Sequence, residues 1–162
     1  MSIALIVGKI LYHSKRTNNM NFKLLNDDKQ KTYAIVLESG EEAMEQILAF
    51  ANEKKIAASQ FTAIGAFSET IVGFFDFSIK DYKKTHFNQQ MEVLSLMGDI
   101  TIFKDQYKIH GHIVLAKEDG SAYGGHLMKG IVHPTLEIIL TESPVYLQRK
   151  MDKDAGIPLI KI

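Results

Sequence analysis

The chain has no cysteine, no net charge and no apolar run long enough to cross a membrane. Without cysteine there is no disulfide framework, no thiolate metal site and no cysteine nucleophile, so a bound metal would have to rest on histidine, aspartate or glutamate. Nineteen basic residues balance nineteen acidic ones, and this balance lacks the basic excess by which proteins neutralise nucleic-acid phosphates. The scattered lysines are typical of a solvated surface, with a local basic face as the alternative.

The start of the chain predicts neither a membrane anchor nor an export signal. Its apolar stretch, residues 3–11, is interrupted by Gly8 and Lys9 and lacks a basic leader and a cleavage site. Together with the absence of cysteine, this favours a cytoplasmic protein. We expect residues 1–20 to form an N-terminal extension, disordered or loosely packed, and residues 21–162 to form one domain.

One principal helix is predicted after the turn-like segment at residues 39–42. Ser39 is suited to cap the helix, and Glu42 stands three residues later, where it can complete a capping box. An apolar stripe at helical spacing follows, made by Met44, Ile47, Leu48 and Ala51. We found no phosphate-binding glycine loop, no serine nucleophile elbow and no internal repeat in the sequence.

The remaining segments read as short β-strands. Residues 31–38, KTYAIVLE, place Tyr33, Ile35 and Leu37 on one face and Ala34 and Val36 on the other, which predicts a strand buried on both sides. Further runs are separated by turn residues at hairpin spacing: SQFTAIGAF, TIVGFFDF, MEVLSLMGDITIF, YKIHGHIVLA, GIVH and TLEIIL. The pattern predicts an α+β fold with a mainly antiparallel sheet and one principal helix. In the GFFDF run, we expect at least two of the three phenylalanines to be core residues.

Four of the six histidines and five of the eleven glycines lie between Ile109 and Glu137. His110 and His112 are two residues apart, so on a strand both side chains leave the same face. His126 follows Gly124 and Gly125, a pair that could fold the chain back toward them. Three neutral imidazoles are a common way to hold a divalent transition metal, zinc or iron, with positions left open for water or substrate.

A plainer interpretation stays open for these histidines, because alternating histidines on a strand can simply form a polar face. Within residues 107–116, His110 and His112 alternate with the larger apolar residues, so they lie on the face opposite the core. Histidines on that face are either exposed or covered, and we expect another subunit to cover them. His133 precedes Pro134 and is a candidate fourth ligand. His13 and His86 are expected at the surface.

The combined pattern resembles the plant-and-prokaryote conserved (PPC) domain, whose bacterial members are often described as DNA-binding proteins with a PD1-like motif. The resemblance rests on SGEEAMEQILAFANEKKI, FTAIGAFSETIVGFFDF, MEVLSLMGDITI and YKIHGHIVLAKEDGSAYGGHLMKGIVHPTLEIIL, and on the closing RKMDKDAGIPLIKI. It covers residues 21–162. It implies a compact α+β domain with a curved, mainly antiparallel sheet, assembled as a homotrimer.

The resemblance also implies a site. The histidines of the family correspond to His110, His112 and His126, and its acidic position corresponds to Glu137, a candidate ligand or general base. Glu92 lies in the matching MEVLSLMGD segment and either orients a histidine from behind or faces solvent. Asp99 stands where the family more usually has asparagine, a change that a turn tolerates.

Three functions follow as alternatives. The first is a trimeric binding or regulatory module that receives a small molecule or a protein partner in the clefts between subunits. The second is a metal-dependent enzyme, with hydrolysis as the first reaction class to test. The third is DNA binding, as the family description suggests; however, plant relatives carry a separate AT-hook, and the nearest basic cluster here, Lys15-Arg16, lacks its glycine and proline.

Overall fold

The computed structural model describes residues 21–26, 30–143 and 148–161. The predicted N-terminal extension, including His13, lies outside the described residues, and its state remains a prediction. The elements in chain order are β1 (Asn21–Asn26), β2 (Thr32–Glu38), α1 (Ala43–Lys54), β3 (Ser59–Asp76), β4 (Asp81–Phe87), β5 (Met91–Phe103), β6 (Gln106–Ala116), β7 (Ala122–Glu142), β8 (Gln148–Met151) and β9 (Pro158–Lys161).

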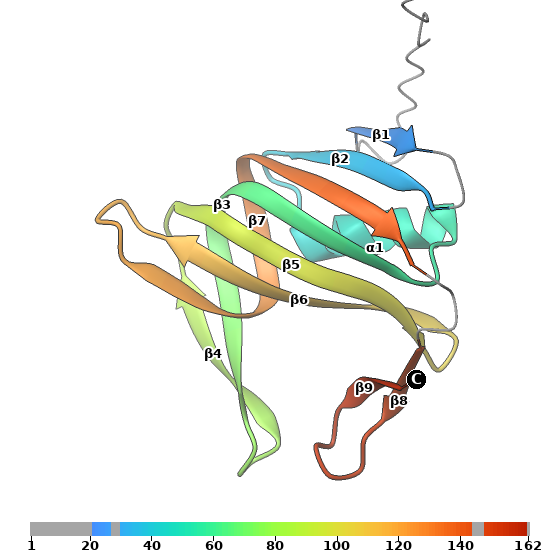
Figure 1. Cartoon of the computed structure of the whole chain (residues 1–162). Helices are drawn as coiled ribbons and strands as arrows, with labels where there is room; N and C mark the ends of the chain where they lie inside the picture. The colour runs from blue at the N-terminus through green and yellow to red at the C-terminus, as the bar shows by residue number, and fades with distance from the viewer. Residues whose placement is uncertain (1–20, 27–29, 144–147, 162) are drawn as a thin grey trace, which may run out of the picture.

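All nine strands form one curved sheet, and α1 lies against one of its faces (Figure 1). The main path runs β1-β2-β7-β3-β5-β8-β9, while β4 pairs with β3, and β6 pairs with both β5 and β7. Every pairing is antiparallel except the short parallel contact of β5 with β8. The predicted fold class, α+β with a curved, mainly antiparallel sheet and one principal helix, is therefore confirmed.

The strands are longer than the sequence pattern suggested. SQFTAIGAF and TIVGFFDF both belong to β3, and GIVH and TLEIIL both belong to β7. Register shifts along the β3–β7 pairing let both strands bend where short strands would have ended. Gly65 makes one shift practicable: its φ is +152°, and a side chain there would overlap the carbonyl oxygen of Thr135.

The helix begins three residues later than the predicted capping box requires. Glu42, in an extended conformation, is the N-cap residue, and its carboxylate accepts a hydrogen bond from the Glu45 backbone N–H at 2.7 Å. Ser39 instead contacts β7, with its hydroxyl 3.0 Å from His133 Nδ1. The same Glu42 carboxylate accepts from the Gly130 backbone N–H at 2.8 Å, so the helix cap also joins α1 to β7.

The core lies between α1 and the inner face of the sheet. Ala43, Ile47, Phe50 and Ala51 are the buried residues of the helix. On β2, Tyr33, Ile35 and Leu37 are buried as expected, whereas Val36 on the other face is 38% exposed. The prediction of a strand buried on both sides is therefore wrong for the single chain, because nothing among the described residues covers the outer face.

The β3–β4 hairpin extends away from the body of the sheet (Figure 1). Phe74 and Phe77, on this hairpin, are 72% and 73% exposed. The expectation that at least two of the three phenylalanines are core residues is wrong, because the hairpin reaches beyond α1. Among the described residues, no helix is long and apolar enough to span a membrane.

Candidate metal centre

The three predicted histidines meet on the outer face of the sheet. His112 on β6 lies directly opposite His126 on β7, and His110 is two residues earlier on β6. One ring nitrogen from each imidazole can be chosen so that all three lie within 4.8 Å of one another. Their rings contact at centroid distances of 4.9 to 5.6 Å. The sequence-based grouping of these histidines is therefore matched by the geometry.

The glycine pair before His126 serves a different purpose from the one expected. The chain reverses earlier, at Gly120, where φ is +79° and Asp119 accepts hydrogen bonds from the backbone and hydroxyl of Ser121. Gly124 and Gly125 lie within β7, where a Cβ would stand 2.8 Å from Ile113 O and 2.9 Å from Gly73 O, respectively. Glycine at these positions lets β7 fit closely between β6 and β3, and this closeness brings His126 to His112.

The histidines occupy the face of β6 opposite the core, as the alternation predicted. Gly111, Ile113 and Leu115 are buried on the inner side, while His112 is exposed and His110 partly exposed. A hollow of about 350 Å³ borders His110 and His112, and its other lining residues are Gln60, Phe61, Thr62, Met97, Gly98 and Asp99. The imidazoles of His110 and His112 are therefore accessible to an ion and to a small molecule beside it.

The surroundings of His112 and His126 favour the neutral form of both imidazoles. Burial, followed by the charges of His110, His112 and Arg149, lowers the pKa of His126 from 6.5 to about 4. Burial and then the charge of His110 lower the pKa of His112. Metal ligation requires an unprotonated ring nitrogen, so the lowered pKa values of His112 and His126 favour binding of a metal cation.

Two further observations show that the three histidines fit a divalent transition metal. His126 Nδ1 is buried and has no hydrogen-bond partner among the described residues, which is costly unless another group satisfies it. The ring of His126 also stacks on Tyr82 at 4.8 Å, which restricts its orientation. Three imidazole donors without thiolates suit zinc or iron and leave coordination positions open.

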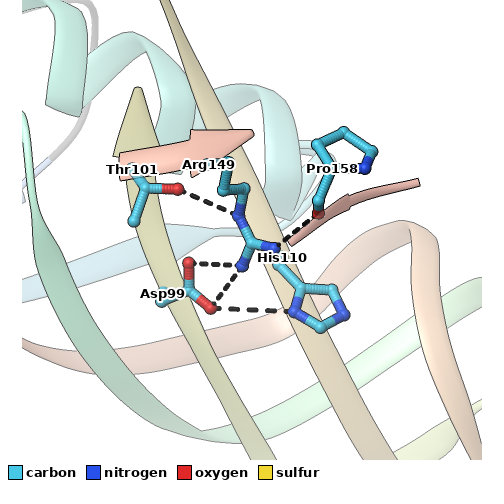
Figure 2. Close-up of polar contacts among 5 residues, drawn as sticks. All are labelled: Asp99, Thr101, His110, Arg149 and Pro158. Carbon is cyan, nitrogen blue, oxygen red and sulfur yellow. Dashed lines mark hydrogen bonds and ion pairs between the residues drawn. The ribbon is translucent and has the colours of Figure 1, made fainter. Parts of the chain in front are cut away.

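A polar network that the sequence did not reveal supports His110. Asp99 Oδ2 lies 3.6 Å from His110 Nδ1, and both carboxylate oxygens of Asp99 accept from Arg149 Nη2, at 2.7 and 2.8 Å (Figure 2). Burial raises the pKa of the Asp99 carboxyl, but its contacts with His110 and Arg149 outweigh burial and lower the pKa overall. Only the composition could have drawn attention to Arg149 in the sequence, since it is one of two arginines in the chain.

Other candidate residues lie apart from the cluster. His133 contacts Ser39 and is not among the grouped histidines, and His86 is exposed on β4, as expected. Glu92 is exposed, so its solvent-facing alternative is confirmed. Glu137 is exposed on the same outer face, but it pairs with Val36 and Ile64, and β3 and β5 separate it from β6.

Fold and site together define a class of protein: a single-helix, curved-sheet domain that gathers three histidines on its open face. A family model for the Plants and Prokaryotes Conserved (PCC) domain matches residues 25–144. The chain belongs to this family, as the sequence resemblance predicted.

Solved structures from three organisms are similar to it. A "putative dna binding protein" from Bacteroides thetaiotaomicron is 26% identical, with a TM-score of 0.79 over 86% of this chain and 96% of that one. A PPC protein from Pyrococcus horikoshii is 29% identical, with a TM-score of 0.77 over 87% and 94%. A protein from Archaeoglobus fulgidus described as metal-containing is 27% identical, with a TM-score of 0.75 over 94% and 100%.

Curated relatives are longer proteins. A bifunctional GlmU protein of Synechococcus is 26% identical to this chain over 130 residues. The match covers 78% of this chain and 19% of the relative, so the chain spans about a fifth of that protein.

Proposed function

We propose that this protein is a homotrimeric binding or regulatory module that holds one divalent transition metal, zinc or iron, at His110, His112 and His126. The proposal rests mainly on the distances between the imidazoles, because one nitrogen from each of the three can be chosen so that all lie within 4.8 Å of one another. The metal-containing description of the Archaeoglobus fulgidus protein supports the assignment by similarity. The small-molecule or protein partner of the module would bind in the hollow beside these histidines.

Competition between the protein and a chromophoric zinc chelator tests the metal site. We expect wild-type protein to take up one Zn²⁺ per chain. His112→Ala should weaken binding by more than the roughly 10- to 100-fold that loss of an outer-shell partner costs, because it removes a ligand outright. His86→Ala is the matched control, since His86 is an exposed histidine on β4 outside the cluster. Equal affinity in the two variants would contradict the assignment.

The family resemblance implies a homotrimer, and the apolar character of the outer face supports an interface between subunits. Large apolar side chains exposed there on β2, β3, β5, β6 and β7 are Val36, Ile64, Leu94, Met97, Val114 and Ile139. Cross-strand pairs connect them, for example Ile139 with Thr62 and Thr62 with Met97, and Met97 in turn lies opposite His112. An apolar surface spread over five strands is typical of an interface between subunits.

Sedimentation of two matched variants tests this interface. Ile64 and Ile79 are similarly exposed, at 59% and 61%, but only Ile64 lies on the outer face of the sheet body. We expect Ile64→Asp to convert a trimer into a monomer, because a carboxylate would be desolvated beside Glu137. Ile79→Asp should leave the trimer intact. A monomeric wild-type protein would contradict the proposal.

A metal-dependent hydrolase is the second candidate, favoured by the hollow that adjoins the histidines. A divalent metal held there would supply Lewis acidity and lower the pKa of bound water. Glu137 is the candidate general base, and its separation from β6 means that it could serve the centre only from a neighbouring subunit. Glu137→Gln should then abolish metal-dependent ester hydrolysis without reducing zinc content. If hydrolysis is undetectable in zinc-loaded wild-type protein, this candidate fails.

DNA binding is the weakest of the three functions, although a structural relative carries that description. The balance of 19 basic and 19 acidic residues supplies no excess charge for counterion release. We expect no retention on duplex DNA even at low salt. Retention that weakens steeply as salt rises would restore this function.

A further inference from the structure

Arg149 is the most completely coordinated charged side chain near the histidines. Its Nε donates to Thr101 Oγ1 at 2.9 Å, its Nη1 to the Pro158 carbonyl oxygen at 3.0 Å, and its Nη2 to both oxygens of Asp99 (Figure 2). Only 8% of the side chain is exposed. All three guanidinium nitrogens are therefore engaged with the protein, so Arg149 is not free to bind an anionic substrate.

These contacts join the C-terminal hairpin, β8–β9, to the sheet. Arg149 and Pro158 belong to the hairpin, whereas Asp99 and Thr101 belong to β5. The backbone pairing between β5 and β8 is limited to Ile102 with Gln148. The guanidinium is consequently a principal polar link between the hairpin and the sheet in the described chain.

The same guanidinium determines where the Asp99 carboxylate lies. Nη2 alone donates to both oxygens of Asp99, and Nη2 is itself held in place because Nε and Nη1 of the same rigid plane bind Thr101 and Pro158. Asp99 Oδ2 then stands 3.6 Å from His110 Nδ1, a distance at which attraction acts without a short hydrogen bond. That attraction favours a proton on Nδ1 and an electron pair on Nε2, and it restrains the ring of His110.

We infer that Arg149, acting through Asp99, is a positioning residue for His110, and that the C-terminal hairpin is therefore part of the metal centre. The inference rests on the proposed metal-binding function. It extends the centre from β6 and β7, which carry the three histidines, to β5, which carries Asp99, and to the β8–β9 hairpin. Outer partners of this kind fix the tautomer and orientation of ligating histidines.

Zinc affinity in matched hairpin variants provides the first test. Arg149→Met removes the contact of Nη2 with both Asp99 oxygens, and we expect Zn²⁺ affinity to fall about 10- to 100-fold. Lys161→Met is the control, because Lys161 pairs with Asp152 at 3.0 Å within the hairpin region, and no hydrogen bond or ion pair joins it to a histidine among the described residues. We expect the control to retain wild-type affinity. If both variants bind zinc as the wild type does, or if both lose affinity equally, the positioning role is overturned.

The visible spectrum of Co²⁺-loaded protein separates positioning from general stability. Arg149→Met should change the intensity and wavelength of the cobalt bands, because His110 is then free to reorient. Lys161→Met should reproduce the wild-type spectrum. Arg149→Lys should resemble Arg149→Met more than the wild type, since a lone ammonium lacks the rigid plane that binds Thr101, Pro158 and Asp99 at the same time.

Nitrogen-15 NMR of the metal-free protein distinguishes failure of this inference from failure of the proposed function. We expect His110 to carry its proton on Nδ1 in the wild type and to become a mixture of tautomers in Arg149→Met. If wild-type protein binds no zinc but shows this change, the metal function fails while the Arg149–Asp99–His110 linkage holds. If the tautomer of His110 is the same in both proteins, the inference fails whether or not zinc binds.

Discussion

Both faces of the sheet carry apolar side chains, but only the inner face is covered within the described chain. The inner face packs against α1, and its residues, such as Ile35, Leu96 and Leu140, are fully buried within the single chain. The outer face exposes Ile64, Leu94 and Met97 together with the histidine cluster. This difference teaches that alternation in a strand assigns residues to a face but does not say what covers that face.

Adjacent residues on β5 give the largest expected contrast between the faces. Leu96 is buried against the core and Met97 is 60% exposed. In the Ile64→Asp background, where we expect a monomer, Leu96→Ala should lower the free energy of unfolding by about 2–5 kcal/mol because it leaves a cavity. Met97→Ala should change it by less than about 0.5 kcal/mol.

Urea unfolding at fixed protein concentration measures both values, since an oligomer would make apparent stability depend on concentration. If both substitutions lowered the free energy of unfolding by a similar amount, the proposed difference between the two faces would be contradicted.

The attachment of α1 to the sheet should have a smaller effect. Glu42 caps the helix and also accepts from the Gly130 backbone N–H. Glu42→Ala should lower the free energy of unfolding by about 1–2 kcal/mol, because both backbone donors lose their acceptor. Glu41→Ala is the control: Glu41 accepts from the exposed Glu38 N–H but does not cap the helix. Equal losses in the two variants would argue against this role for Glu42.

The smallest expected effect is on the free energy of unfolding of the metal-free protein at acid pH. The pKa of His126 is about 4 in the folded chain and 6.5 as an ordinary histidine. Because the unfolded chain binds the extra proton, the contribution of His126 to stability is present above pH 6.5 and is lost as the pH falls toward 4. Partial solvent exposure reduces its size.

Unfolding measured in the presence of a chelator from pH 7.5 to 4.5 tests this expectation. His126→Asn should flatten the pH dependence over that range relative to the wild type. A pH dependence unchanged by the substitution would show that the histidine keeps its ordinary pKa.

Much of this architecture could be predicted from local patterns. The helix, the hairpin turn near Lys104 and the strands containing Met91–Phe103 and Gln106–Ala116 follow from periodicity and turn chemistry. The continuity of β3 and β7 could not be read in the same way, because Gly65 and the register shifts bend strands that local patterns would end. The exposure of Phe74 and Phe77 was missed for a similar reason, since hydrophobic content does not reveal how far a hairpin extends.

The candidate site, too, was predictable from the sequence only in part. Spacing alone placed His110 and His112 on one face, and the glycine pair led to His126. The Arg149–Asp99 pair joins residues distant in sequence, so no local pattern could reveal it. Glu137 was suggested by family resemblance, and its role as a base remains a prediction; β3 and β5 stand between it and the two histidines of β6.

Metal analysis of the purified, untagged protein by inductively coupled plasma mass spectrometry tests the central claim most directly, with His110→Ala and His126→Ala measured in parallel. We predict close to one zinc or iron per chain in the wild type and loss of that metal in both variants. Absence of metal from the wild type, even after incubation with zinc, iron and manganese, would contradict the assignment of the three histidines as a metal centre.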